Sequence, residues 1–187
     1  MDIYKHGWTT LQEEIFSLLA VRAGEKLSQR DIAKLLGVSP TAIANSLKVL
    51  KSENMVLIEK TKTINFVSFN RDEPRAIQKK RTENLSNIYS SGMLEGLESP
   101  LAGATLILFG SYAKGEDTST SDIDLAVIGR KERSLDLERY EKILHRRINV
   151  NFYHSLKAIH QHLRNNILNG IVLLGSVETG SYRFWTI

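Results

Sequence analysis

Residues 105–125 of the chain read TLILFGSYAKGEDTSTSDIDL, and this stretch decides the fold of the second half of the sequence. Its first five residues form an uninterrupted apolar run of strand length, which leads directly into Gly110 and Ser111. After ten further residues, Asp122 and Asp124 stand two apart at the start of a second apolar run. Side chains two residues apart leave the same face of a strand. The stretch therefore predicts two strands, with a Gly-Ser turn after the first and two carboxylates on one face of the second.

Both features suit the chemistry of phosphates. Backbone N–H groups at Gly110 and the hydroxyl of Ser111 can approach a triphosphate closely, and a helix that begins there points its positive end at the anion. The carboxylates of Asp122 and Asp124 can hold Mg²⁺, which bridges substrate phosphates. Lys114 either meets the triphosphate or is simply solvated, and the sequence leaves both alternatives open. The stretch thus predicts a site for phosphoryl-transfer chemistry.

With these residues the chain resembles the minimal nucleotidyltransferases of the DNA polymerase beta superfamily. The match is carried by Leu108–Ser111 and Ser121–Val127. The resemblance implies a domain over residues 101–187 with a mixed sheet and helices on one face. It also implies transfer of a nucleotidyl group from a nucleoside triphosphate, with Mg²⁺, to a protein or RNA acceptor. The implied roles are catalysis and metal binding for Asp122 and Asp124, and nucleotide binding for Gly110, Ser111 and Lys114.

The chain departs from the family pattern at the next strand. Family members carry a third carboxylate there, whereas the expected strand over residues 148–152 offers Asn149 and Asn151 at its alternating positions. An amide oxygen can coordinate Mg²⁺, but an amide has no charge and cannot serve as a general base. Glu141 or Asp136 would replace the missing acid only if the fold turned one of them inward. We therefore expect a metal–nucleotide site in which the role of the third carboxylate is weakened or lost.

The first 73 residues show the pattern of three helices followed by a β-hairpin. Apolar side chains at helical spacing predict a first helix over residues 9–23. Ser28 and Ser39 are the expected N-caps of the second and third helices, and Gly37 ends the second. The expected hairpin strands are Val56–Lys60 and Ile64–Phe69.

Residues 27–60, LSQRDIAKLLGVSPTAIANSLKVLKSENMVLIEK, resemble a winged helix-turn-helix domain. Such a domain places its third helix in the major groove of DNA. Residues 1–73 hold ten basic and nine acidic side chains, so binding would depend on clustered rather than total charge. A winged helix used for protein contact is the alternative. The residues expected to face DNA are Ser39, Thr41, Ala42, Asn45, Ser46 and Lys48 on the third helix, with Lys60 and Lys62 at the hairpin tip.

Residues 74–100 are expected to link the two domains. A long, mostly polar helix is predicted over residues 75–97, and its apolar positions are sparse. This pattern favours a connector over a core element. A homodimer formed through the same helix is an alternative that stays open.

Composition narrows the function classes further. A chain of 187 residues with 42% hydrophobic residues is long enough for two small α+β domains. It contains no cysteine, which excludes disulfides and thiol nucleophiles. His160 and His162 stand two apart on a predicted helix and should face different ways, so no zinc site is expected. Short apolar runs and the absence of a signal sequence lead us to expect a cytoplasmic protein without membrane contact.

The sequence is compatible with two functions. The first is a Mg²⁺-dependent nucleotidyltransferase coupled to a DNA-binding winged helix. The second is a DNA-binding transcriptional regulator whose transferase-like domain has lost turnover and only senses a nucleotide. The amides at Asn149 and Asn151 favour the second, and the intact pair of Asp122 and Asp124 favours the first.

Overall fold

The computed structural model describes residues 7–177, so the outer ends of both expected domains lie outside the described residues. Contacts divide the chain into two compact units. The N-terminal unit comprises Met1–Ser86 and Lys114–Ser121, and the C-terminal unit comprises Asn87–Ala113 and Asp122–Ile187. The division does not follow chain order, because a short segment of the second half belongs to the first unit. Within residues 7–177 no helix is both long and apolar enough to cross a membrane.

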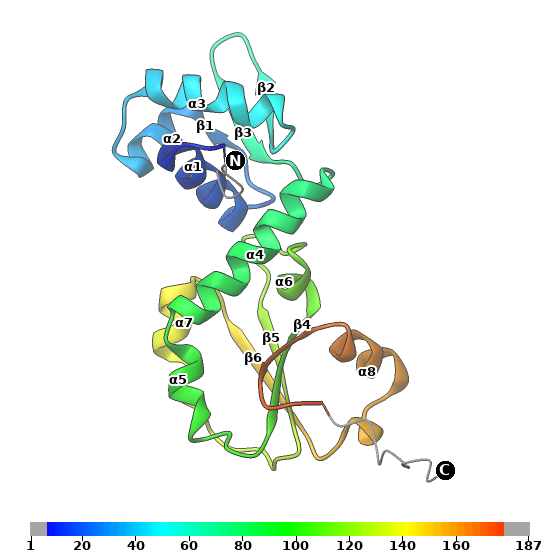
Figure 1. The fold of residues 1–187 in the computed structure, drawn as a ribbon. Helices are drawn as coiled ribbons and strands as arrows, with labels where there is room; N and C mark the ends of the chain where they lie inside the picture. Colours follow the sequence, from blue (N-terminus) through cyan, green and yellow to red (C-terminus); the bar gives the residue numbers. More distant parts are fainter. Residues whose placement is uncertain (1–6, 178–187) are drawn as a thin grey trace, which may run out of the picture. The chain divides into compact units, whose positions relative to one another are not determined.

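Ahead of α4 (Pro74–Ser90), the described part of the N-terminal unit contains three helices and a small antiparallel sheet (Figure 1). The strand order is β1-β3-β2, so the hairpin strands pair as the sequence predicts and the short strand β1 adds to the free side of β3. The sequence does not predict β1, because two residues are too few to show a strand pattern. The elements are α1 (Thr10–Val21), β1 (Leu27–Ser28), α2 (Gln29–Leu36), α3 (Pro40–Ser52), β2 (Val56–Lys60) and β3 (Asn65–Phe69).

Local capping explains where these helices begin and end. The Ser28 side chain accepts a hydrogen bond from the Asp31 backbone while the Asp31 carboxylate accepts one from the Ser28 backbone, which forms a capping box. Gly37 ends α2 in the left-handed conformation, with φ of 67°. Ser39 Oγ accepts from Ala42 N at 3.2 Å at the start of α3. Each cap contributes about 1 kcal/mol, so local sequence alone sets these boundaries.

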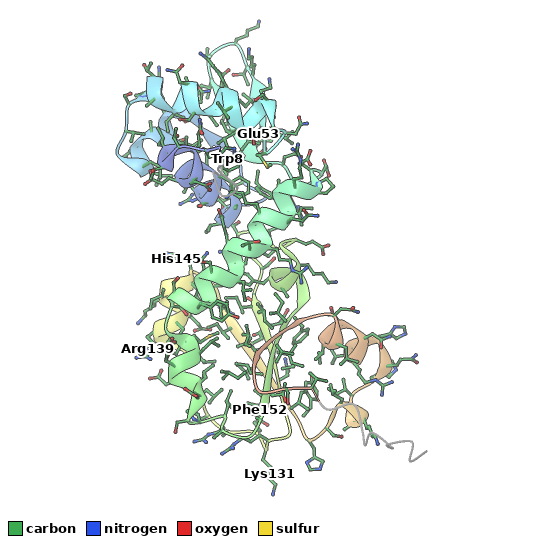
Figure 2. The ribbon with its side chains drawn as sticks, in the orientation of Figure 1. Trp8, Glu53, Lys131, Arg139, His145 and Phe152 are labelled. Atoms are coloured by element: carbon green, nitrogen blue, oxygen red, sulfur yellow. The ribbon has the colours of Figure 1, made fainter. Side chains whose placement is uncertain are left out.

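The core of this unit brings all three helices onto the sheet. Ile15, Phe16 and Leu47 are essentially inaccessible to solvent and belong to one cluster with Val67 of β3. Trp8 packs against Phe16 with ring centroids 5.3 Å apart, and its Nε1 donates to Glu53 Oε2 at 2.8 Å (Figure 2). Trp8, two residues before α1, thus binds the C-cap residue of α3.

The predicted linker helix is interrupted and partly buried. The structure has α4 (Pro74–Ser90) and α5 (Met93–Glu98), separated at Gly92, whose φ is +71°. Ala76, Lys80, Asn84 and Ile88 follow one another at four-residue spacing and are all buried. The expectation that this segment lies outside the core was therefore wrong. Two of the four buried residues are polar, and an apolar pattern cannot show them.

The C-terminal unit is built on a mixed sheet, as expected, and the sheet has four strands. Its strand order is β6-β5-β4-β7, with β5 and β6 parallel and the other pairs antiparallel. The strands are β4 (Thr105–Phe109), β5 (Ile123–Ile128), β6 (Ile148–Tyr153) and β7 (Ile171–Leu174), and the further helices are α6 (Gly110–Lys114), α7 (Glu138–Leu144), the 3₁₀ turn η1 (Leu156–Ala158) and α8 (Gln161–Leu168).

Helices cover both faces of this sheet, so the prediction of helices on one face was wrong (Figure 1). Leu106 and Leu108 of β4 join the cluster that contains residues of α5 and α7. Ile107 and Phe109 join a second cluster with Ile167 of α8. A strand that is apolar at every position must be covered on both faces. The run TLILF carries that signal.

Charged side chains join α4 to α1 within the N-terminal unit. Lys79 Nζ lies 2.6 Å from a carboxylate oxygen of Glu13, and Ser17 Oγ donates to Glu83 Oε1 at 3.0 Å. Burial raises the pKa of Glu83 to about 7, although the Ser17 hydrogen bond and the charges of Lys79 and Lys80 act in the opposite direction. The carboxyl group of Glu83 therefore titrates near neutral pH in the folded protein.

Glu83→Gln should remove a pH dependence of stability. Because the folded-state pKa of about 7 exceeds the ordinary value of 4.5, bound protons stabilise the fold below pH 4.5 and this stabilisation is lost as the pH rises through 7. Urea unfolding measures the free energy of unfolding of both proteins at pH 5 and pH 8. Between pH 5 and pH 8, the value for Glu83→Gln should rise relative to that of the wild type by on the order of 2 kcal/mol. A difference between the two proteins that does not change with pH would contradict the assignment.

Candidate functional site

The Gly-Ser turn and the carboxylate pair meet because β4 and β5 are antiparallel neighbours. Phe109, the last residue of β4, pairs with Asp124, so Gly110 comes directly beside the Asp124 side chain. A Cβ atom on Gly110 would lie 2.6 Å from Asp124 Oδ2, and Gly110 has φ of +76°. The backbone conformation therefore favours glycine here, and a Cβ atom would displace the Asp124 carboxylate.

Asn149 completes a group of three side chains. The parallel register of β5 and β6 pairs Asp124 with Asn149 and Ala126 with Asn151. Asn149 Nδ2 donates to Asp122 Oδ2 at 3.0 Å and lies 3.5 Å from Asp124 Oδ1. Asn151 is exposed and sits beside Ala126, two residues farther along the strand. The register thus brings Asn149, rather than Asn151, to the pair.

The electrostatics of the pair favour a bound cation. Burial raises the pKa of Asp124 above its ordinary value; the hydrogen bond from Asn149 lowers it, and the nearby charge of Asp122 raises it further. Two carboxylates and one amide are oxygen donors of the kind that Mg²⁺ prefers, since the Asn149 amide presents its oxygen after a simple flip. Among residues 7–177 no group of three or more His, Cys, Asp or Glu is arranged to hold a metal ion. The donors present therefore fit Mg²⁺ with two charged ligands and not three.

Glu141 does not supply the missing carboxylate. Its Oε1 accepts a hydrogen bond from the Ile148 backbone N–H at 2.8 Å, which ties α7 to the first residue of β6. Asp136 is exposed in the segment before α7. Neither acid is turned toward Asp122 and Asp124 in the way that a third ligand requires.

The helix expected after the Gly-Ser turn is short. α6 contains five residues, so its dipole is much smaller than that of a full helix, and the expected attraction of a helix end for phosphates is weak. Ser111 is partly buried in the C-terminal unit. Lys114, the last residue of α6, is exposed and belongs to the N-terminal unit by its contacts. Phosphate contacts at this turn would thus come from Gly110 and Ser111 themselves.

The residues expected to face DNA divide into two groups. Thr41, Lys48, Lys60 and Lys62 are exposed, and Asn45 accepts a hydrogen bond from Lys48 at 3.0 Å. The placement of Ser46 on the exposed face was wrong, because only 7% of its surface is accessible and it follows the buried face of α3. Ser39 is exposed but its hydroxyl caps α3, and Ala42 is half-buried.

The two histidines lie closer together than the sequence indicates. His160 precedes α8 instead of lying within it, and the rings of His160 and His162 are 5.6 Å apart. The expectation that they face different ways was wrong, because it assumed helical geometry at both positions.

Gly110→Ala should be more harmful than Gly129→Ala. Both glycines have positive φ, +76° and +88°, but a Cβ atom at Gly129 meets nothing within 4 Å. Each substitution should cost about 1 kcal/mol in backbone strain, and Gly110→Ala should cost more because it also displaces the Asp124 carboxylate. Thermal unfolding of the two variants measures the difference, and equal losses would show that the close approach to Asp124 has no energetic weight.

Comparisons with known proteins concern the part of the chain that holds this site. Residues 102–179 match the family described as "Polymerase beta, Nucleotidyltransferase". The chain is also 41% identical over 70 residues to a protein of Methanocaldococcus jannaschii named "Putative protein adenylyltransferase", with 35% of this chain and 72% of the relative covered. No solved structure matches the chain at a significant level. Through residues 102–179, which include Gly110, Asp122 and Asp124, the chain belongs to the polymerase beta type of nucleotidyltransferases.

Proposed function

We propose that the chain transfers a nucleotidyl group from a nucleoside triphosphate to an acceptor, with ATP and a protein hydroxyl as the first choices. The observation that carries the proposal is the meeting of Asp122, Asp124 and Asn149 beside the Gly110 turn. The name of the archaeal relative supports an adenylyl group and a protein acceptor. An RNA hydroxyl is the alternative acceptor for the same nucleotidyl transfer.

The reaction exchanges one phosphorus–oxygen bond for another. The acceptor oxygen bonds to the α-phosphorus, the bond from that phosphorus to the β-phosphate oxygen breaks, and pyrophosphate leaves. Asp122, Asp124 and the Asn149 oxygen would hold Mg²⁺, which when bound neutralises charge on the triphosphate and the leaving pyrophosphate. Gly110 and Ser111 would contact the phosphates through backbone N–H groups and a hydroxyl.

The proton of the acceptor hydroxyl needs a different destination from that in relatives with three acids. Asn149 cannot accept it, because a neutral amide is not a base at ordinary pH. The carboxylate of Asp124, whose pKa is raised, already interacts with Asn149 and with the charge of Asp122. The proton would therefore pass to solvent or to a base on the acceptor. We expect slow turnover that depends strongly on the acceptor.

Asp122→Asn and Asp124→Asn should each reduce transfer at least a hundredfold. Either substitution removes one of only two charged ligands for the metal. The assay incubates the full chain with each of the four α-³²P-labelled nucleoside triphosphates, Mg²⁺, and protein or RNA acceptors, and measures label incorporated. Asp136→Asn, an exposed acid of the same unit, is the matched control and should keep wild-type activity. Equal activity in Asp124→Asn and Asp136→Asn would overturn the site.

A second candidate is a regulator that binds the nucleotide without turnover. The observation that favours it is Asn149 at the position where a third carboxylate would complete the metal site. The same assay distinguishes the two functions when combined with isothermal titration of a nucleotide in the presence of Mg²⁺. Binding that depends on Asp122, without incorporation of label, would establish the regulator and exclude the transferase.

For the N-terminal unit we propose a winged helix that binds DNA through α3 and the β2–β3 hairpin. Three helices with a β1-β3-β2 sheet support this arrangement. The turn of the hairpin is held by Thr61, whose N–H donates to Ile64 O at 3.0 Å and whose Oγ1 accepts from Ile64 N at the same distance. Lys60 and Lys62 are therefore exposed on an ordered tip, where phosphate contact is available to both.

Lys60→Ala with Lys62→Ala should weaken DNA binding in a salt-dependent way. Removing two phosphate contacts should lower the slope of log affinity against log salt by about 2. Fluorescence anisotropy with duplex DNA over a salt series measures this slope. Lys131→Ala, an exposed lysine of the C-terminal unit, is the control (Figure 2). An unchanged slope in the double variant would favour the protein-contact alternative for this unit.

A further inference from the structure

The segment between the Gly-Ser turn and the carboxylate pair makes its contacts in the N-terminal unit. Residues 114–121, the connecting loop, lie between Ser111 and Asp122 in the sequence, yet their contacts belong to the N-terminal unit. Asp117, at the centre of this loop, is 1% exposed. Nothing in the nucleotidyltransferase signature requires a buried acid at this position, so its surroundings call for an explanation.

Two side chains of α4 bind the Asp117 carboxylate, one at each oxygen. Lys80 Nζ donates to Oδ2 at 2.8 Å, and Asn84 Nδ2 donates to Oδ1 at 2.7 Å. Lys80 is also 1% exposed and donates a further hydrogen bond to Ala20 O of α1 at 2.8 Å. The loop is therefore attached through a buried ion pair and a hydrogen bond from an uncharged amide, which come from successive turns of one helix.

The loop backbone packs just as closely. Ser119 N donates to Ala23 O at 3.0 Å. A Cβ atom on Gly115 would lie 2.5 Å from Ile77 O and 2.8 Å from Arg81 N, so only glycine allows this approach to α4. The loop is therefore packed against α4 and the end of α1 within the N-terminal unit.

The last residues of the connecting loop form a hydrogen-bonded turn that ends at the carboxylate pair. Thr118 N donates to Ser121 Oγ at 2.9 Å, and Ser121 N donates to Thr118 O at 3.1 Å, which closes a turn immediately before Asp122. Four residues, ordered by this turn, separate the buried Asp117 from Asp122. A loosened Asp117 would therefore release the chain at the first carboxylate of the pair.

We propose that Lys80, Asn84 and Asp117 are positioning residues for nucleotidyl transfer, which hold the connecting loop so that Asp122 keeps its place beside Asp124. The inference rests on the proposed function of the pair. A buried ion pair contributes little net stability over apolar residues of similar volume, but its directed hydrogen bonds specify one geometry. The three residues act through the loop and touch neither nucleotide nor acceptor.

The test compares Asn84→Ala with Ser17→Ala in the full chain. Asn84→Ala removes one hydrogen bond to Asp117 and keeps the ion pair. Ser17→Ala is the matched control, because it removes a hydrogen bond of similar length to α4, that of Ser17 to Glu83, without touching the loop. Hydrogen exchange of the peptide over residues 115–121 reports the loop, and steady-state transfer reports kcat, KM for the nucleotide and the Mg²⁺ concentration for half-maximal rate.

Asn84→Ala should speed exchange in the loop, lower kcat about tenfold, raise the Mg²⁺ requirement several-fold and leave KM within twofold, because Gly110 and Ser111 are untouched. Ser17→Ala should change none of these values. A loosened loop with wild-type kcat, or equal losses in both variants, would overturn the positioning role while the proposed function stands. A wild type that transfers no nucleotide overturns the proposed function and the positioning role together.

A second variant covers the case in which Asn84→Ala does not fold. Ser121→Ala removes the hydroxyl that accepts from Thr118 N and leaves the buried ion pair in place. The same fall in kcat and rise in the Mg²⁺ requirement are expected, with unchanged exchange at Asp117. Wild-type kinetics in Ser121→Ala would show that the turn before Asp122 does not govern the pair, and would overturn the proposal.

Discussion

The arrangement of the site depends on the register of three strands. Antiparallel pairing sets Phe109 opposite Asp124, and parallel pairing sets Asp124 beside Asn149. A slip of one residue in either ladder would turn the carboxylates to the opposite face of the sheet. The register is specified because the alternating residues of β5, Ile123 and Leu125, are buried in the core on the other face. Hydrophobic burial on one face thus positions the charged groups on the other.

The asparagine in this group changes the balance of charge. As a hydrogen-bond donor, the Asn149 amide stabilises two neighbouring carboxylates that would otherwise repel each other. A third acid would add charge for a metal ion but would also increase that repulsion. The amide therefore lowers the repulsion within the pair but gives the site no base.

Through the connecting loop, the site depends on α4, a helix that is distant in the sequence. The loop between Ser111 and Asp122 is attached to α4 by Lys80 and Asn84, which precede Asp117 by 37 and 33 residues. Charged residues on a mostly polar helix predict a solvated surface, and only the approach of an acid from far along the chain makes their burial favourable. For this reason the sequence pattern alone indicates that residues 75–97 lie outside the core.

The sequence by itself determined the elements that rest on local interactions. Caps at Ser28 and Ser39, the glycine after α2, the hairpin strands and the order of Gly110, Asp122 and Asp124 all follow from neighbours a few residues apart. Tertiary structure decided the choice of Asn149 over Asn151 and the burial of Ser46. Tertiary structure also decided that the connecting loop packs within the N-terminal unit. These features depend on strand register and on partners brought from far along the chain, which no short window of sequence contains.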